Sequence, residues 1–253
     1  MADGKVKNIS TFVPYNIEVM NLFYVPDIEG DYYTLDPDES KHCIRVLRFT
    51  EGDPVSIVDG RGNWYNGVID RADVKGCGIK VLEKIEQYGK RPCRLHLAIA
   101  PTKNIDRTEW MLEKCTEMGI DAFTLLNTAH SERKAVKEER LEKVIVAAMK
   151  QSLKAYLPEL NPMTDFRKFV TSCKEARKYI AHCHQGVKKR LDEVYQPGDD
   201  VVILIGPEGD FSTEEIALAE KHGFVAVTLG TSRLRTETAG IVACHSIDFM
   251  NKI

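Results

Sequence analysis

The sequence lacks several features that would each assign a class of protein at once. No run of apolar residues approaches the ~20 that a membrane-spanning helix needs, so we expect no membrane span. The seven cysteines form no Cys-X-X-Cys pair and are irregularly spaced, which favours reduced thiols over a disulfide framework. The first residues contain no apolar segment that ends in small residues, so we expect no signal peptide. These absences together predict a cytoplasmic protein.

An excess of charge of one sign is also missing. The formal net charge is -3; residues 20–90 carry 9 basic and 13 acidic side chains, and residues 91–253 carry 24 and 23. Neither half shows the broad basic surface that is typical of a nucleic-acid-binding domain. Any RNA contact must therefore come from local patches, and we expect modest affinity for naked RNA.

The most informative stretch that is present begins with residues 201–205, which are all apolar. Such a run is typical of a strand that is buried on both faces in a parallel sheet. The turn Gly206-Pro207-Glu208-Gly209-Asp210-Phe211 follows, and Ser212 with Glu215 then predicts a capping box at the start of a helix. This turn would lie at the carboxyl end of the strand, where open α/β sheets bind their ligands.

A second strand and loop follow the predicted helix. Residues 224–229 read as a buried strand that ends in Gly230 and an irregular loop at 231–235. We expect Thr236 to cap a last helix that runs to the C-terminus. Two glycine-bearing loops at successive strand ends favour a binding site over two tight turns without a ligand, although the latter would be the better explanation of either loop alone.

The charges of the first loop argue against a phosphate ligand. A glycine-rich turn at a helix N-terminus often binds phosphate, but Glu208 and Asp210 would repel a polyphosphate. The turn also has no lysine or serine at the spacing of a P-loop. A ligand that carries hydroxyl groups and a positive centre fits the loop better, and a phosphate-binding enzyme is disfavoured.

The rest of the chain predicts a fold in two parts. Residues 1–19 are polar and poorly periodic, so we expect an extension outside the fold. Residues 20–90 contain short strands separated by Gly/Asp turns, which indicates a small β-barrel, and a helix is predicted from Ser40 to Leu47. From 91 to 253 strands and helices alternate, as in an α/β fold with a mostly parallel sheet.

Two motifs make the chain resemble a known family. Ile205 to Phe211, followed by Leu229-Gly230 and by Leu234-Arg235-Thr236-Glu237-Thr238-Ala239, is similar to the bacterial 16S rRNA (uracil-N3) methyltransferase family of the SPOUT superfamily. There are departures from the pattern: the family usually has a second glycine where Asp210 stands, and Pro-Arg-Ile where residues 231–233 stand.

The resemblance implies a fold, a cofactor and partners. It implies a PUA-like β-barrel, then a SPOUT methyltransferase domain with a C-terminal trefoil knot, forming a homodimer. The substrate would be 16S rRNA, in the assembled 30S subunit, and the cofactor S-adenosyl-L-methionine. The implied cofactor-binding residues belong to the two loops: Leu204, Ile205, Gly206, Glu208, Gly209, Leu229, Gly230, Leu234, Thr238 and Ala239.

The chemistry of the implied reaction suggests roles for further residues. The uracil imide nitrogen bears a proton, so transfer needs a general base and stabilisation of the charge that develops. We hypothesise that Arg235 stabilises that charge or positions a phosphate and that Glu237 accepts or orients the proton; an Arg235–Glu237 ion pair that only shapes the loop is an equal alternative. The candidates for binding RNA are the basic side chains His42, Arg45, Arg48, Lys103 and Arg133.

Two rival functions remain open at this level. A SPOUT enzyme that modifies another rRNA or tRNA position would carry a similar catalytic loop. A non-catalytic RNA-binding relative would keep the fold, although the intact loop from Gly206 to Gly209 argues against it. The triplet His182-Cys183-His184 resembles a metal site, but neighbouring residues of a strand point to opposite faces, so a structural role is favoured and we expect no metal.

Overall fold

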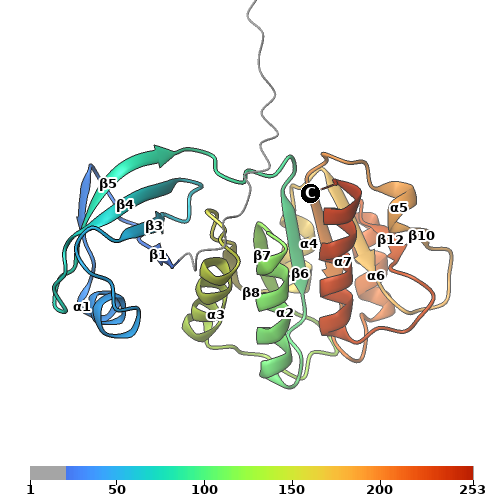
Figure 1. Ribbon diagram of the computed structural model, residues 1–253. Helices are drawn as coiled ribbons and strands as arrows, with labels where there is room; N and C mark the ends of the chain where they lie inside the picture. Colours follow the sequence, from blue (N-terminus) through green and yellow to red (C-terminus); the bar gives the residue numbers. More distant parts are fainter. Residues whose placement is uncertain (1–20, 253) are drawn as a thin grey trace, which may run out of the picture.

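The structure, a computed structural model, describes residues 21–252, so the predicted N-terminal extension (1–19) lies outside the described residues. Figure 1 shows a small β-rich part, coloured blue to cyan, beside a larger layered part. The small part contains a five-stranded sheet in the order β1-β3-β4-β5-β2, and the large part a seven-stranded sheet in the order β10-β12-β9-β11-β6-β7-β8. All strand pairs of the seven-stranded sheet are parallel, which confirms the predicted α/β class.

The five-stranded sheet is built from short strands around its own core. Its strands are β1 (Leu22–Tyr24), β2 (Tyr32–Thr34), β3 (Pro54–Val58), β4 (Trp64–Arg71) and β5 (Gly78–Ile85). Side chains such as Phe23, Ile57 and Ile79 are fully buried between the strands and the helical segment that follows β2. This core is separate from that of the large sheet, so the small part carries its own hydrophobic centre.

The helical segment of the small part differs from the prediction. The α-helix α1 covers only Pro37–Lys41, with Asp36 as its N-cap, and a π-helix, η1, follows at His42–Val46. The predicted helix from Ser40 to Leu47 is therefore wrong in its bounds and partly in its type. A π-helix holds more residues per turn than an α-helix, so side chains spaced by three no longer share one face as they would in an α-helix.

The large sheet is covered by helices on both faces. Its strands are β6 (Leu95–Ile99), β7 (Ala122–Asn127), β8 (Glu159–Asp165), β9 (Arg177–Ala181), β10 (Lys189–Arg190), β11 (Val201–Ile205) and β12 (Val225–Thr228). The helices of the face seen in Figure 1 are α2 (Ile105–Glu117), α3 (Glu138–Gln151), α5 (Leu191–Val194) and α7 (Thr236–Met250). The opposite face packs against α4 (Phe166–Ser172) and α6 (Thr213–Lys221).

The apolar run of β11 explains why the sheet needs helices on both sides. Val201, Ile203 and Ile205 pack into the core beneath α2, α3 and α7. Val202 and Leu204 point the other way, into the core beneath α4 and α6. Because successive side chains of a strand alternate between faces, a strand buried on both faces must be apolar throughout, as predicted.

Some elements carry weaker sequence patterns and were not expected. Strand β8 lies at the edge of the sheet beside β7, and it contains Pro162, which an edge strand tolerates because one side needs no hydrogen-bond donor. The short helices α4 and α5 were also not predicted. Among residues 21–252, no helix has both the length and the apolar character needed to cross a membrane.

Candidate functional site

A cavity of about 850 Å³ lies at the carboxyl edge of the large sheet. Strands β9, β11 and β12 are neighbours and parallel, so the loops that follow them meet at this edge. Residues from all three loops line the cavity, together with the N-terminal end of α7 and Arg107 of α2. The site therefore occupies the place where α/β sheets of this kind bind their ligands.

The turn after β11 forms one wall and is fixed by hydrogen bonds. A side chain at position 206 would place its Cβ 3.1 Å from the Phe211 backbone nitrogen, so the tight turn favours a glycine there. Glu208 Oε1 accepts a hydrogen bond of 3.0 Å from the Lys103 backbone N–H. At the far end of the turn, Ser212 and Glu215 form the capping box of α6, which confirms that prediction.

The loop after β12 forms the opposite wall and leads into α7. Leu229, Gly230, Leu234 and Ala239 line the cavity together with Ile205, so apolar side chains from two motifs face the same space. The N-cap of α7 is Arg235, and no side chain caps the helix there. The predicted capping by Thr236 is wrong, because the Thr236 hydroxyl donates instead to the Gly206 carbonyl, at 3.1 Å, and joins the two walls.

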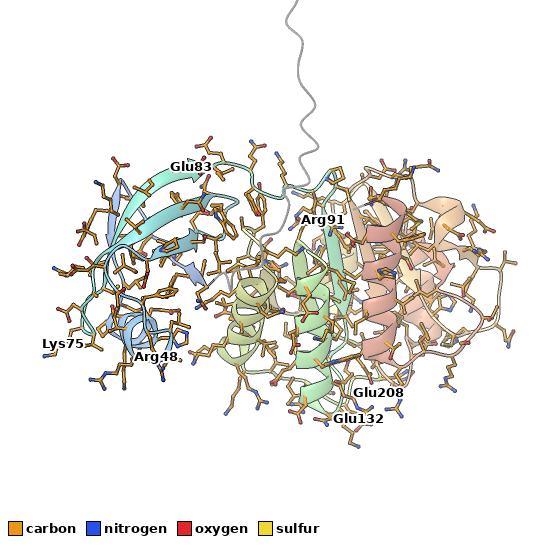
Figure 2. All side chains as sticks on the ribbon, viewed as in Figure 1. Arg48, Lys75, Glu83, Arg91, Glu132 and Glu208 are labelled. Carbon is orange, nitrogen blue, oxygen red and sulfur yellow. The ribbon has the colours of Figure 1, made fainter. Side chains whose placement is uncertain are left out.

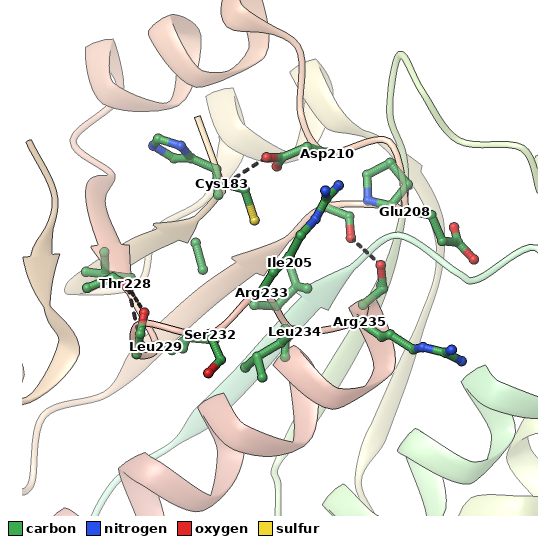
Figure 3. A pocket seen from close by; sticks show the side chains of 18 of the residues that line it. Cys183, Ile205, Glu208, Asp210, Thr228, Leu229, Ser232, Arg233, Leu234 and Arg235 are labelled. Atoms are coloured by element: carbon green, nitrogen blue, oxygen red, sulfur yellow. Dashed lines mark hydrogen bonds between the residues drawn. The ribbon is translucent and has the colours of Figure 1, made fainter. Parts of the chain in front are cut away.

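The two residues predicted to be catalytic lie at the same helix end but in different surroundings. Glu237 is buried, and its Oε1 is 3.7 Å from Arg107 Nη1, while its Oε2 is buried without a hydrogen-bond partner. Arg235 is exposed, and Figure 3 shows its side chain extending outward from the loop, away from the direction taken by Arg233. No ion pair joins Arg235 to Glu237 within residues 21–252; the cation beside Glu237 is Arg107, a residue to which the sequence assigned no role.

The segment after β9 forms the third wall of the cavity and was not assigned to the site from the sequence. Residues 181–184 and Lys188 line the cavity, and the Lys188 ammonium donates to the carbonyls of His182 and His184 at 3.0 and 2.8 Å. Both ring nitrogens of His182 are buried without a hydrogen-bond partner. Burial, and then the charge of Lys188, lowers the pKa of His182, which favours a neutral ring.

Neighbouring loops support the turn after β11 from outside the cavity. His130 Nδ1 donates to the carbonyls of Gly209 and Asp210, at 3.1 and 3.0 Å. Arg133 donates through Nε to the Thr102 carbonyl and through Nη2 to the Lys103 carbonyl. The Lys103 ammonium is 2.7 Å from Glu132 Oε2. Figure 2 shows Glu132 and Glu208 close together at this edge, with Arg91 at the opposite edge.

These contacts bear on two residues predicted to bind RNA, Arg133 and Lys103. The guanidinium of Arg133 already binds two backbone carbonyls, so part of its hydrogen-bonding capacity serves the fold. Lys103 is 72% exposed at its side chain and pairs with another exposed residue, so it can exchange Glu132 for a phosphate at little cost. In the small part of the molecule, His42, Arg45 and Arg48 are all exposed.

Most of the predicted cofactor-binding residues line the cavity, but some do not. Leu204 is fully buried and packs on the opposite face of the sheet, because it alternates with Ile205 along the strand. A side-chain contact between Leu204 and a ligand in this cavity is therefore not compatible with the fold. Gly209, whose absent side chain leaves room for His130, and Thr238 are also outside the lining.

The lining can hold a nucleoside that carries a positive centre, although the cations Arg107, Lys188, Arg233 and Arg235 line the cavity beside its carboxylates. Apolar side chains of Ile205, Leu229 and Leu234 can pack against an aromatic base, and the glycines allow close approach of the backbone. Carboxylates of Glu208, Asp210 and Glu237 lie around the same cavity, and the unpartnered Glu237 Oε2 is an acceptor that the protein leaves free. The residues present thus suit the sulfonium cofactor that the resemblance implies.

Comparison with known proteins adds independent findings. A family model described as an RNA methyltransferase domain matches residues 89–248, and another described as an RNA methyltransferase PUA domain matches residues 35–82. Ribosomal RNA small subunit methyltransferase E from Synechocystis is 29% identical over 221 residues, covering 85% of this chain and 72% of that protein.

Solved structures give the same assignment. The crystal structure of a probable rRNA-methyltransferase from Porphyromonas gingivalis is 42% identical, with a TM-score of 0.87, over 92% of this chain and 99% of that one. A methyltransferase from Legionella pneumophila, solved in complex with the bound cofactor SAM, is 30% identical with a TM-score of 0.81, over 91% and 97% of the two chains.

Proposed function

The chain belongs to the RNA methyltransferase family whose domain model covers residues 89–248, and we propose that it methylates N3 of a uridine in the 16S RNA of the small ribosomal subunit. The cofactor of the proposed reaction is S-adenosyl-L-methionine. The observation that carries the proposal is the cavity at the carboxyl edge of the sheet, which both sequence motifs line. The Legionella pneumophila protein of 30% identity was solved in complex with the bound cofactor SAM.

The cofactor supplies an electrophilic methyl group when it is bound. In this proposal Ile205, Leu229 and Leu234 hold its base, and the backbones of Gly206 and Gly230 approach it closely. Glu208, in the turn after β11, adds negative charge to the lining of the cavity. The protein's contribution at this stage is to orient the methyl group and to exclude water around it.

Uracil N3 carries a proton, and the protein must help to remove it. Glu237 has one oxygen beside Arg107 and one buried oxygen without a partner, so a movement of the helix end that exposes this oxygen would let it accept a hydrogen bond from the imide or take the proton. Arg235 is exposed at the same helix end and can stabilise negative charge on the uracil oxygens or bind a neighbouring phosphate. Arg107 holds the carboxylate of Glu237 in place.

The RNA surface would run from the site to the small part of the molecule. Lys103 lies beside the cavity, where its backbone N–H binds Glu208, and its side chain is exposed. His42, Arg45 and Arg48 are exposed on the small part. The match of residues 35–82 to an RNA methyltransferase PUA domain supports a role in RNA binding for this part. Because the net charge is -3, an assembled 30S particle, with its larger contact surface, is the proposed substrate in the cytoplasm.

The proposal includes a homodimer and the C-terminal trefoil knot. Helices α2 and α7 lie side by side on one face of the sheet (Figure 1), and both expose large apolar side chains: Trp110 is 47% and Phe249 is 74% exposed. A second copy of the chain would cover these side chains. The hydrogen bond from Thr236 to Gly206 supports close packing of the two loops that would form the knot.

Methyl transfer from labelled S-adenosylmethionine to 30S subunits that lack their own modifications tests the proposal. The modified base is mapped by mass spectrometry. Label on uracil N3 of 16S RNA is the expected result. Label on another RNA or on another atom would show that the protein is a methyltransferase with a different target. RNA binding without cofactor binding would identify the protein as a non-catalytic relative.

A further inference from the structure

Asp210 occupies an unusual place in the turn after β11. Its φ is +64°, a left-handed conformation that a glycine adopts without strain and that other residues enter only at a cost. The resemblance leads one to expect glycine at this position. Because the aspartate adopts a backbone conformation that is less favourable for it than for glycine, we expect its side chain to make stabilising contacts that glycine cannot make.

The side chain of Asp210 joins two segments that are distant in the sequence. Its Oδ2 accepts a hydrogen bond of 2.7 Å from the Cys183 backbone N–H, and its Oδ1 accepts one of 2.8 Å from the Phe211 N–H. Figure 3 shows the carboxylate of Asp210 directed at the Cys183 backbone, above the cavity. One carboxylate therefore ties the end of β9 to the turn after β11.

A second contact between the same segments lies beside the first. His184 Nε2 donates to the Phe211 carbonyl at 2.7 Å and is 3.8 Å from Asp210 Oδ2. The other side-chain hydrogen bonds of residues 181–188 in the structure run from Lys188 to the carbonyls of His182 and His184, and Val187 is 98% exposed. Ala181 is held in the sheet by its pairing with Ile205 and Val227. Asp210 and His184 therefore attach the part of the cavity wall beyond the strand, residues 182–184, to the turn after β11.

We propose that Asp210 is a positioning residue for the cofactor cavity: it holds the wall formed by residues 182–184 against the bound S-adenosylmethionine. The inference rests on the proposed function, because it takes this cavity as the cofactor site. Asp210 acts through the backbone of Cys183 and needs no contact with the reacting atoms. A carboxylate that accepts two backbone N–H groups makes charge-assisted hydrogen bonds, which are the stronger kind.

The test compares Asp210→Gly and Asp210→Asn with the wild type in the full-length protein. Calorimetry measures the Kd for S-adenosylmethionine, and initial rates on 30S subunits at varied cofactor concentration give the KM for S-adenosylmethionine and kcat. For Asp210→Gly we expect Kd and KM to rise roughly tenfold, the equivalent of one lost charge-assisted bond. We expect kcat at saturating cofactor to stay within about twofold, and Tm to fall only modestly, because the relief of the positive φ by glycine offsets part of the loss of the two hydrogen bonds.

The asparagine variant separates geometry from charge. Asp210→Asn keeps one oxygen acceptor and tolerates the left-handed conformation, so its Kd should lie between those of the wild type and Asp210→Gly. A Kd equal to that of the glycine variant would overturn positioning through the hydrogen bonds in favour of the charge alone. Asp36→Gly is the matched control, because Asp36 also accepts two backbone N–H bonds, in the small part of the molecule.

The outcomes distinguish the inference from the proposed function. If the wild type binds S-adenosylmethionine and Asp210→Gly binds it equally well, the inference alone is overturned. The same holds if Tm and kcat fall together in every Asp210 variant, since that result describes a merely structural residue. If the wild type itself binds no S-adenosylmethionine, the proposed function fails and the inference fails with it.

Discussion

The ion pair between Arg107 and Glu237 should respond asymmetrically to the loss of either partner. The Glu237 side chain is 8% exposed and the Arg107 side chain 44%. Arg107→Ala leaves a buried carboxylate without its cation, whereas Glu237→Gln leaves a guanidinium that water can solvate. We therefore expect the arginine variant to lose more of the free energy of unfolding than the glutamine variant.

The magnitudes follow from the geometry. Breaking a fully buried pair by removing one partner costs about 3–5 kcal/mol. The atoms here are 3.7 Å apart and Arg107 is partly in water, so we expect about 2 kcal/mol for Arg107→Ala. Glu237→Gln loses mainly the favourable position of a negative charge in the first turn of α7, which amounts to about 0.3–1 kcal/mol.

Urea denaturation of both single variants and of the double variant measures these terms. The double variant Arg107→Ala/Glu237→Gln should be more stable than Arg107→Ala alone, because it removes the uncompensated buried charge. Equal losses for the two single variants, or strict additivity in the double variant, would refute the asymmetry. In the transfer assay Glu237→Gln should lower kcat at saturating cofactor, since an amide cannot accept the uracil proton.

Further predictions concern other parts of the molecule. Arg235→Ala should abolish methyl transfer with little change in cofactor Kd, and turnover near the wild-type rate would contradict its role. The hydrogen bond from His96 lowers the pKa of Glu175 from 4.5 to about 2. The ionised Glu175 therefore stabilises the folded state by up to about 3 kcal/mol. This contribution is fully present above pH 4.5 and is lost as the pH falls through 2. Urea denaturation at pH 5 and pH 3 should show this loss, and Glu175→Gln should flatten it. Trp110→Glu and Phe249→Glu should shift light-scattering mass from dimer to monomer, and an unchanged mass would exclude this interface.

Local patterns were sufficient to predict the central strand and its turn. The apolar run at 201–205 marks β11 because it is buried on both faces, and Ser212 with Glu215 marks the start of α6 because a capping box is made within four residues. Both features depend on neighbours in the sequence. The same holds for the cavity residues of the two motifs, which lie directly at strand ends.

Features that depend on distant partners were not predictable in this way. Thr236 has the residue type of a helix cap, but its hydroxyl finds the Gly206 carbonyl, which is 30 residues away in the chain. Glu237 pairs with Arg107 rather than Arg235, because α2 and α7 pack together. The sequence does not state which helices become neighbours, so it leaves the choice between these partners open.

The order of the strands explains why residues 181–184 belong to the site. Strand β9 lies between β11 and β12 in the sheet, so the segment after β9 must emerge between the two loops that carry the motifs. Its side chains then line the cavity whatever their identity, while the motif loops supply the atoms nearest to the proposed reaction. Substitutions in this segment, or in Asp210, which holds it, can therefore change cofactor affinity while the chemistry proposed for Arg235 and Glu237 stays intact.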